Sequence, residues 1–128
     1  MNLSLRIPGG LTLQPIRLDL ERQSSRSADI RVIRLAGKLS LETVHNFISA
    51  MRSEAASLLV LDMSSVHFLD SAGVGALVAL FVSRRNSDKK LALAALAEQG
   101  IAVLQVSGLI DLLPLYTSVD LAIRQVKL

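Results

Sequence analysis

An aspartate and a serine stand where an apolar, strand-like segment gives way to an apolar, helix-like one. Asp70 and Ser71 follow a run that starts at Leu58, and residues 72–82 carry no charged or polar side chain. The first turn of a helix leaves backbone N–H groups unpaired and carries the positive end of the helix dipole, so an anion is stabilised there. The simplest role for either residue is that of an N-cap.

The serine is also a candidate site of phosphorylation. A phosphate on Ser71 would bring about −1.5 to −2 charges to the helix N-terminus, where the dipole and the free N–H groups tolerate them. It would also lie beside the carboxylate of Asp70. We expect the fold to survive this change, whereas a partner docked on the same corner would meet like charge and added bulk.

Two glycines, Gly73 and Gly75, fall in the first turns of the predicted helix. Each costs about 1 kcal/mol relative to alanine in a helix interior, and an N-cap does not explain them. They predict a close approach to the helix start, either by the neighbouring sheet or by the backbone or phosphate of a partner.

Two catalytic interpretations of this segment fail on their mechanical requirements. Residues 71–73 match the second half of the hydrolase elbow G-x-S-x-G, but Leu69 replaces the first glycine, and both His45 and His67 precede the serine. No Gly-Lys-Ser/Thr follows either glycine, as a P-loop requires. The histidines lack ligand-spaced companions and the chain has no cysteine, so no metal site is expected.

The composition indicates one cytoplasmic domain of bacterial type. A chain of 128 residues can bury about two thirds of its unfolded surface. The formal charge of +3 and the aromatic content of 3% do not suit a nucleic-acid-binding protein. The first ten residues do not resemble a secretory signal, and the apolar run over 72–82 is too short to span a bilayer.

Hydrophobic periodicity predicts an α/β order of elements with crossover connections. Residues 3–7 and 11–13 alternate about a turn and predict a hairpin, and Pro15 marks a break before a new alternating strand. The other predicted elements are a loop over 23–29, a strand over 30–35 that ends at Gly37, a helix over 40–56, a strand over 58–62, a buried helix over 72–82, a charged turn over 84–90, a strand over 91–96, a brief helix around 101–108, a strand over 112–116 and a helix over 117–126.

Several side chains have expected local roles. Ser40 is expected to cap its helix, His45 to face solvent, and the cations of residues 84–90 to be solvated at a helix end. Residues 117–120 resemble a capping box with Asp120 in place of Glu or Gln. The helix that follows Ser40 has its apolar stripe at Val44, Phe47, Ile48, Met51 and Ala55.

The residues around Ser71 carry a resemblance to a known family. The segment Val66–Val78, with Phe-Leu-Asp-Ser-Ala-Gly-Val-Gly at its centre, resembles the signature of the STAS domain, the sulphate-transporter and anti-sigma-factor-antagonist module. Residues 31–39, 58–62 and 104–109 agree with the family in order and spacing, so the resemblance covers about residues 16–126.

The resemblance implies a single α/β STAS-like domain. Its expected architecture is a mixed central sheet of about four to six strands, with helices packed mainly on one face. We place this domain at residues 15–128 and an N-terminal extension, a hairpin or edge strand, at residues 1–14.

The resemblance also implies a protein-binding switch in a partner-switching pathway. Such antagonists bind an anti-sigma factor that is also a serine kinase, phosphorylation of the serine matching Ser71 releases them, and a phosphatase restores binding. ATP belongs to the kinase, so this chain is expected to have no catalytic residue and no cofactor. The resemblance assigns partner contacts to Lys38, Leu39, Ser40, Asp70, Ser71, Ala72, Gly73 and Val74.

The sequence departs from the family after its second strand, and other functions stay open. Antagonists usually have Gly-Glu-Leu-Asp there, whereas residues 37–40 are Gly-Lys-Leu-Ser, which makes the partner surface more basic. One alternative is a constitutive adaptor subunit of a lipid-transport or signalling complex, in which Ser71 is only an N-cap. Another is a sensor that binds a nucleotide or anion at the helix mouth. A homodimer, with contacts from residues 1–14, is also left open.

Overall fold

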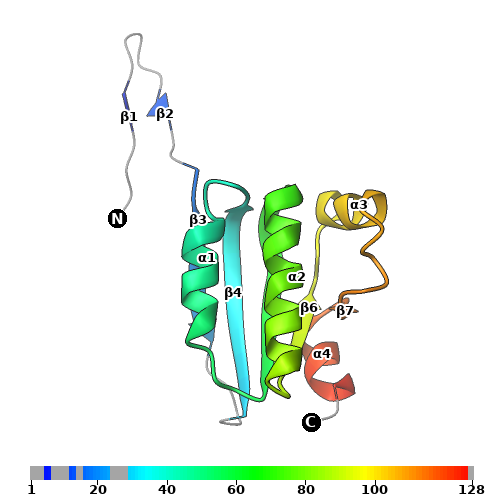
Figure 1. Cartoon of the computed structure of the whole chain (residues 1–128). Coiled ribbons are helices and arrows are strands. Elements are labelled where there is room, and N and C mark those ends of the chain that lie inside the picture. Colours follow the sequence, from blue (N-terminus) through cyan, green and yellow to red (C-terminus); the bar gives the residue numbers. More distant parts are fainter. Residues whose placement is uncertain (1–4, 7–11, 14–15, 24–28, 127–128) are drawn as a thin grey trace.

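The computed structural model describes residues 5–6, 12–13, 16–23 and 29–126, and they form the predicted mixed α/β fold (Figure 1). A five-stranded sheet has the order β3-β4-β5-β6-β7, in which β3 is antiparallel to β4 and the other neighbours are parallel. Its strands are β3 (Leu18–Gln23), β4 (Ile30–Leu39), β5 (Leu58–Leu69), β6 (Lys90–Ala94) and β7 (Leu115–Tyr116).

The N-terminal strands form a separate two-stranded sheet. β1 (Leu5–Arg6) pairs with β2 (Thr12–Leu13) in antiparallel fashion, with Leu5 opposite Leu13. The described part of the predicted hairpin is thus confirmed, and the rest of that prediction lies outside the described residues.

Helices cover the two faces of the large sheet unequally, as expected. The larger core joins the sheet to α1 (Val44–Arg52), α2 (Ser71–Asn86) and α3 (Glu98–Val106), whereas α4 (Val119–Gln125) packs on the opposite face against a smaller core. Side chains of β5 alternate between these cores because successive residues of a strand point to opposite faces. Leu59 and Leu61 therefore enter the larger core, and Leu58 and Val60 enter the smaller one.

Two strands run further than the sequence pattern predicted. The prediction ended one strand at Asp62, but β5 continues to Leu69, and its register with β4 shifts twice. These bulges accommodate the polar residues that had indicated a loop. β4 likewise passes through Gly37, whose φ of 122° and contact with the Arg17 carbonyl exclude a side chain. The strand continues beyond this glycine to Leu39, and its register with β5 shifts there.

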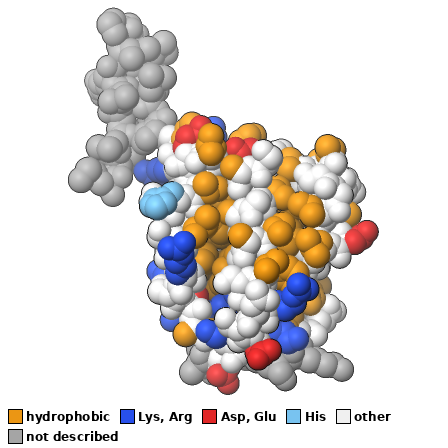
Figure 2. Space-filling view, in the orientation of Figure 1, with side chains coloured by type: hydrophobic (Ala, Val, Ile, Leu, Met, Phe, Trp, Pro, Cys, Tyr) orange, Lys and Arg blue, Asp and Glu red, His pale blue; other side chains and the backbone are white. Residues whose placement is uncertain are grey.

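α2 lies between α1 and α3 and keeps an exposed side, so the helix predicted to be buried over 72–82 is buried only in part. Val74 and Leu77 are buried against the sheet, whereas Gly75, Ala79 and Val82 are exposed. The partly buried Val78, Leu80 and Phe81 of α2 pack against the larger core. Figure 2 shows the resulting bands of hydrophobic side chains along the helical face.

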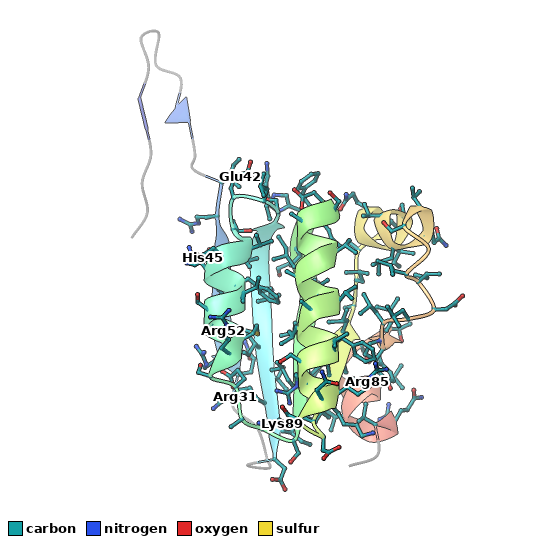
Figure 3. The ribbon with its side chains drawn as sticks, viewed as in Figure 1. Arg31, Glu42, His45, Arg52, Arg85 and Lys89 are labelled. Carbon is teal, nitrogen blue, oxygen red and sulfur yellow. The ribbon has the colours of Figure 1, made fainter. Side chains whose placement is uncertain are left out.

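α1 is shorter than predicted, and Ser40 is not its N-cap. The N-cap position is held by Thr43, without a side-chain cap, and Ser40 lies in the preceding turn with its hydroxyl donating to Glu42 at 2.8 Å. Ala55 lies beyond the end of the helix at Arg52 and is exposed. His45 is solvent-facing as predicted (Figure 3).

The C-terminal elements follow the predicted order with shifted ends. β6 confirms the choice of a strand for the alanine- and leucine-rich segment, and β7 is confined to two residues. The cap of α4 is Ser118, whose Oγ accepts from Leu121 N–H at 3.1 Å, so the capping box predicted from Thr117 is wrong by one residue.

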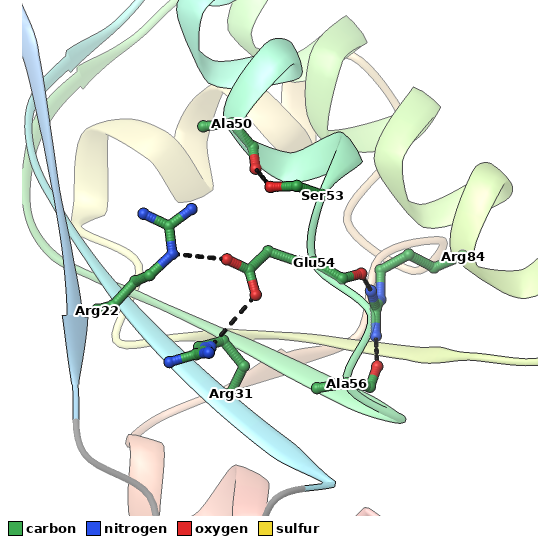
Figure 4. Close-up of polar contacts among 7 residues, drawn as sticks. All are labelled: Arg22, Arg31, Ala50, Ser53, Glu54, Ala56 and Arg84. Carbon is green, nitrogen blue, oxygen red and sulfur yellow. Dashed lines mark hydrogen bonds and ion pairs between the residues drawn. The ribbon is translucent and has the colours of Figure 1, made fainter.

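Arg84 was expected to be solvated, but it is only 4% exposed. Its guanidinium donates to the carbonyls of Lys90 at 2.8 Å, Glu54 at 3.1 Å and Ala56. A guanidinium has five donors in a rigid fork and can serve several acceptors at once. Arg84 therefore ties the end of α2 to the connection between α1 and β5 (Figure 4).

The Glu54 carboxylate is buried beside this arginine and is bound by two arginines of the sheet. Arg22 of β3 donates to it at 2.7 Å, and Arg31 of β4 lies at 3.3 Å (Figure 4). Burial lowers the pKa of the Arg84 guanidinium, and the charge of Glu54 opposes that effect. Helix, connection and edge strand are thus joined by one network of charges.

Candidate functional site at the start of helix α2

The carboxylate of Asp70 holds two segments of the chain together. Its Oδ1 accepts from Gly73 N–H at 2.8 Å, which makes Asp70 the N-cap of α2. Its Oδ2 accepts from Leu41 N–H at 3.1 Å, across to the loop between β4 and α1. The cap role predicted for one of the two residues thus falls to Asp70, and the same side chain fixes the neighbouring loop.

That loop has a polar core of its own. Thr43 Oγ1 donates to the Lys38 carbonyl at 2.8 Å and accepts from Ser40 N–H at 3.0 Å. Both Ser40 and Thr43 are buried. Residues 37–40 lack the acidic residues that are usual in the family. The exposed Glu42, which accepts a hydrogen bond from the Ser40 hydroxyl, provides a carboxylate in the same loop.

Gly73 is required by the fold, whereas Gly75 is not. A Cβ at residue 73 would overlap the carbonyl oxygen of Leu39 and press on Leu69. A Cβ at residue 75 would meet nothing within 4 Å. Of the two origins proposed for the glycines, the neighbouring sheet accounts for Gly73, and Gly75 leaves an open stretch of helix backbone near Ser71.

Ser71 is the first residue of α2 and is exposed. The Asp70 carboxylate accepts from Gly73 N–H, and the backbone carbonyl of Asp70 accepts from Val74 N–H at 2.9 Å. The N–H groups of Ser71 and Ala72 precede those bonded positions, where a helix offers no intrahelical acceptor. The serine hydroxyl thus lies at an exposed, electropositive end, which is accessible to a modifying enzyme and able to carry a phosphate.

Apolar side chains surround this end of the helix on the described surface. Leu41 is 71% exposed, and Phe68 is 39% exposed. The ammonium group of Lys38 lies 5.8 Å from the centre of the Phe68 ring, within the range of a cation–π contact. We call Lys38, Leu41, Phe68, Ser71 and Ala72 the switch surface.

The structure brings the eight predicted site residues to one corner but gives them different exposures. Ser71 is exposed, and Lys38, Asp70 and Ala72 are half-buried. The buried members are Leu39, Ser40, Gly73 and Val74. The buried members set the position of the corner, while the exposed and half-buried members form its surface.

Sequence reasoning did not single out three residues of this corner. Leu41 and Phe68 are exposed apolar residues whose exposure only the fold reveals. Gln99 of α3 holds the end of β5 through both groups of its amide, accepting from Leu69 N–H at 2.9 Å and donating to the Leu69 carbonyl at 2.8 Å. A lone glutamine at the start of a helix gives no sequence signal for such a bridge.

Other chemistries find little support in the described part of the chain. It contains no group of three His, Cys, Asp or Glu side chains placed to hold a metal ion. None of its helices has the length and apolar character needed to cross a membrane. Cavities of about 320 and 330 Å³ are lined by neither Asp70 nor Ser71, although Lys38 lines the second.

Comparisons with known proteins agree with this fold. A crystal structure of an anti-sigma factor antagonist from Mycobacterium paratuberculosis matches with a TM-score of 0.74 and 21% identity, over 86% of this chain and 94% of that one. The Bacillus cell fate determinant SpoIIAA in its phosphorylated form matches at 0.63 and 21%, over 85% and 100%. A sulfate transporter family protein from Wolinella succinogenes matches at 0.65 and 16%, over 79% and 87%.

The family itself is established by sequence. The model of the STAS domain family matches residues 21–122. This match covers most of the chain, so the protein belongs to the STAS domain family, and the resemblance seen around Ser71 is confirmed.

Proposed function

We propose that this protein is an anti-sigma factor antagonist that binds an anti-sigma factor with serine kinase activity through the switch surface. Phosphorylation of Ser71 ends the binding and a phosphatase restores it. The protein acts in the bacterial cytoplasm without catalytic residues or a cofactor of its own, because the kinase supplies the ATP. Residues 15–128 form the binding domain, and residues 1–14 are an extension outside it.

One observation carries this proposal. Ser71 is exposed at the N-terminus of a 16-residue helix, while Asp70 caps that helix and anchors the adjoining loop. A phosphate on Ser71 can therefore be added without unfolding the helix, and it would lie next to the Asp70 carboxylate. The modification changes charge and bulk at the surface and leaves the scaffold intact.

The composition of the switch surface also suits a protein partner. Leu41 and Phe68 offer apolar area, and Lys38 offers one cation over the Phe68 ring. Apolar anchors surrounded by polar groups are typical of binding hot spots. A doubly charged phosphate in the middle of such a patch must be desolvated on binding, which weakens the complex. Two neighbours in fold, an anti-sigma factor antagonist and the phosphorylated SpoIIAA, support the same function.

The first experiment follows the modification in the protein's own cells. Intact-mass and fragment-mass analysis across growth and stress conditions should show a fractional gain of one phosphate that maps to Ser71 and varies with conditions. If Ser71 stays unmodified in every condition, the phosphorylation step is wrong and a constitutive adaptor becomes the better description.

The second experiment tests the switch with purified proteins. Ser71→Ala should stay folded and bind the anti-sigma kinase permanently, and Ser71→Asp should stay folded and bind it at least about ten times more weakly. Ser57→Asp is a matched control, because Ser57 is exposed next to the other end of β5. Titration calorimetry measures binding, and circular dichroism checks the fold. Unchanged binding by Ser71→Asp contradicts the proposal.

A further inference from the structure

A groove with apolar and charged lining residues runs between α1 and α2, apart from the switch surface. It has a volume of about 320 Å³. Its apolar lining residues are Phe47, Ile48, Met51, Ala76, Ala79 and Leu80. Figure 2 shows hydrophobic side chains along this seam on the outer face of the helices.

The charged side chains of the groove lie at one end, and those not engaged within the protein are positive. Arg52, in the last turn of α1, and Lys89, after α2, line it, and neither has an ion-pair partner among the described residues (Figure 3). The Glu54 carboxylate at that end is buried and bound to two arginines of the sheet. Asp88 is close in sequence but is not part of the lining.

The buried guanidinium at this end does not add a free charge. The donors of Arg84 are directed to the carbonyls of the α1–β5 and α2–β6 connections. The groups left to meet a ligand are therefore the guanidinium of Arg52 and the ammonium of Lys89. Both favour carboxylates.

We infer that this groove binds an amphipathic α-helix of a partner protein, with acidic residues at the end that meets Arg52 and Lys89. A groove between two helices accepts a third helix that inserts one apolar side chain per turn. Small residues on the exposed side of α2, Ala79 and Ser83, let the backbone of such a helix come close.

A second copy of this chain fits the groove less well. Two copies packed groove to groove would each bring a cationic end, and no free carboxylate lines the groove to meet it. The chemistry of the groove therefore favours a different, acidic protein. The groove begins at Ala76, beyond the first turn that carries Ser71, so its occupation does not depend on the phosphorylation switch.

The inference is tested by titrating the isotope-labelled full chain with two synthetic helical peptides. Both carry leucine at positions i, i+3, i+4 and i+7, and their exposed positions are Glu in one and Lys in the other. The Glu peptide should shift the NMR signals of Ile48, Met51, Ala79 and Leu80 and bind at least ten times more tightly than the Lys peptide. Equal binding, no binding, or shifts confined to the switch surface overturn the inference.

Variants separate the groove from general charge and from the switch. The double variant Arg52→Glu with Lys89→Glu should reverse the preference between the peptides, whereas Arg85→Glu should not, since Arg85 lies over the Phe81 ring outside the groove. Ala79→Gln should abolish binding, and Val82→Gln, on the same helix but outside the lining, should preserve it. Ser71→Asp should bind the Glu peptide like the wild type, even where it loses the anti-sigma kinase.

Sedimentation velocity of the free protein tests whether a second copy of the chain occupies the groove. A concentration-dependent dimer that Ala79→Gln dissociates would show that a second copy fills the groove, and it would overturn the inference. A monomer at all concentrations, together with the peptide preference, supports it.

Discussion

Gly73 of α2 packs directly on the carbonyl oxygen of Leu39 at the end of β4, so the start of the helix has no space for a side chain there. Gly73→Ala forces these backbones apart and is expected to lower the free energy of unfolding by about 1–3 kcal/mol, as overpacking does. Urea unfolding followed by circular dichroism measures the change.

Gly75→Ala is the matched control in the same helix. Its Cβ would point into open space, so the variant should gain up to about 1 kcal/mol from helix propensity. The two substitutions should therefore change the free energy of unfolding in opposite directions. A loss of stability in both variants would contradict the packing described at the helix start.

The two bonds of the Asp70 carboxylate predict a double effect of its removal. Asp70→Ala loses the cap of α2 and the anchor of Leu41, and it should cost about 1–2 kcal/mol of unfolding free energy. Ser118→Ala, which removes the cap of α4, should cost about 1 kcal/mol. Hydrogen exchange should speed up at the Leu41 and Gly73 amides in the first variant alone. Unchanged protection of Leu41 would show that the loop is held by other contacts.

Leu41 is expected to be an energetic anchor of the switch surface. Leu41→Ser removes exposed apolar area, so it should leave stability within about 0.5 kcal/mol of wild type while weakening binding of the proposed kinase by at least about tenfold. Val106→Ser is the control, because Val106 is 90% exposed on α3 outside the switch surface. Titration calorimetry measures the affinity of both variants for the partner. Equal affinities would show that Leu41 is not part of the interface.

Arg84 should be intolerant even of lysine. Lysine cannot reproduce the fork that serves three carbonyls, and each buried acceptor left without a donor costs about 1–3 kcal/mol. Arg84→Lys is therefore expected to lower the unfolding free energy by about 2 kcal/mol or more, whereas Arg85→Lys should be nearly neutral because Arg85 is exposed. Denaturant unfolding of the two variants tests this contrast between sequence neighbours.

The order of the elements could be predicted because each has a local signal. The run from Leu58 to Leu61 is uniformly apolar and is buried in full, and the stripe of α1 is buried at Phe47 and Met51. The candidate site could be predicted at Asp70 and Ser71 because a polar pair before an apolar helix is a cap signal. Even the alanine-rich β6 could be assigned, since its place between two helices demanded a strand.

The remaining features depend on contacts between residues far apart in sequence. Arg84 is part of a run of cations, and only the carbonyls brought to it by the α1–β5 connection make it a buried residue. β5 continues beyond Asp62 through bulges in its pairing with β4. The polar residues of this part of the strand are typical of a loop, so the sequence pattern did not predict it. The exposure of Leu41 likewise follows from how Asp70 fixes its loop.

The outer strands of the described sheet also bear on solubility at high concentration. β3 presents the exposed charges of Asp19, Glu21 and Arg22, and β7 is only two residues long. Unpaired strand edges can template the growth of fibrils, and charged or very short edges oppose it. In the proposed switch the protein is released from its partner in each cycle, and these edges oppose aggregation while it is unbound.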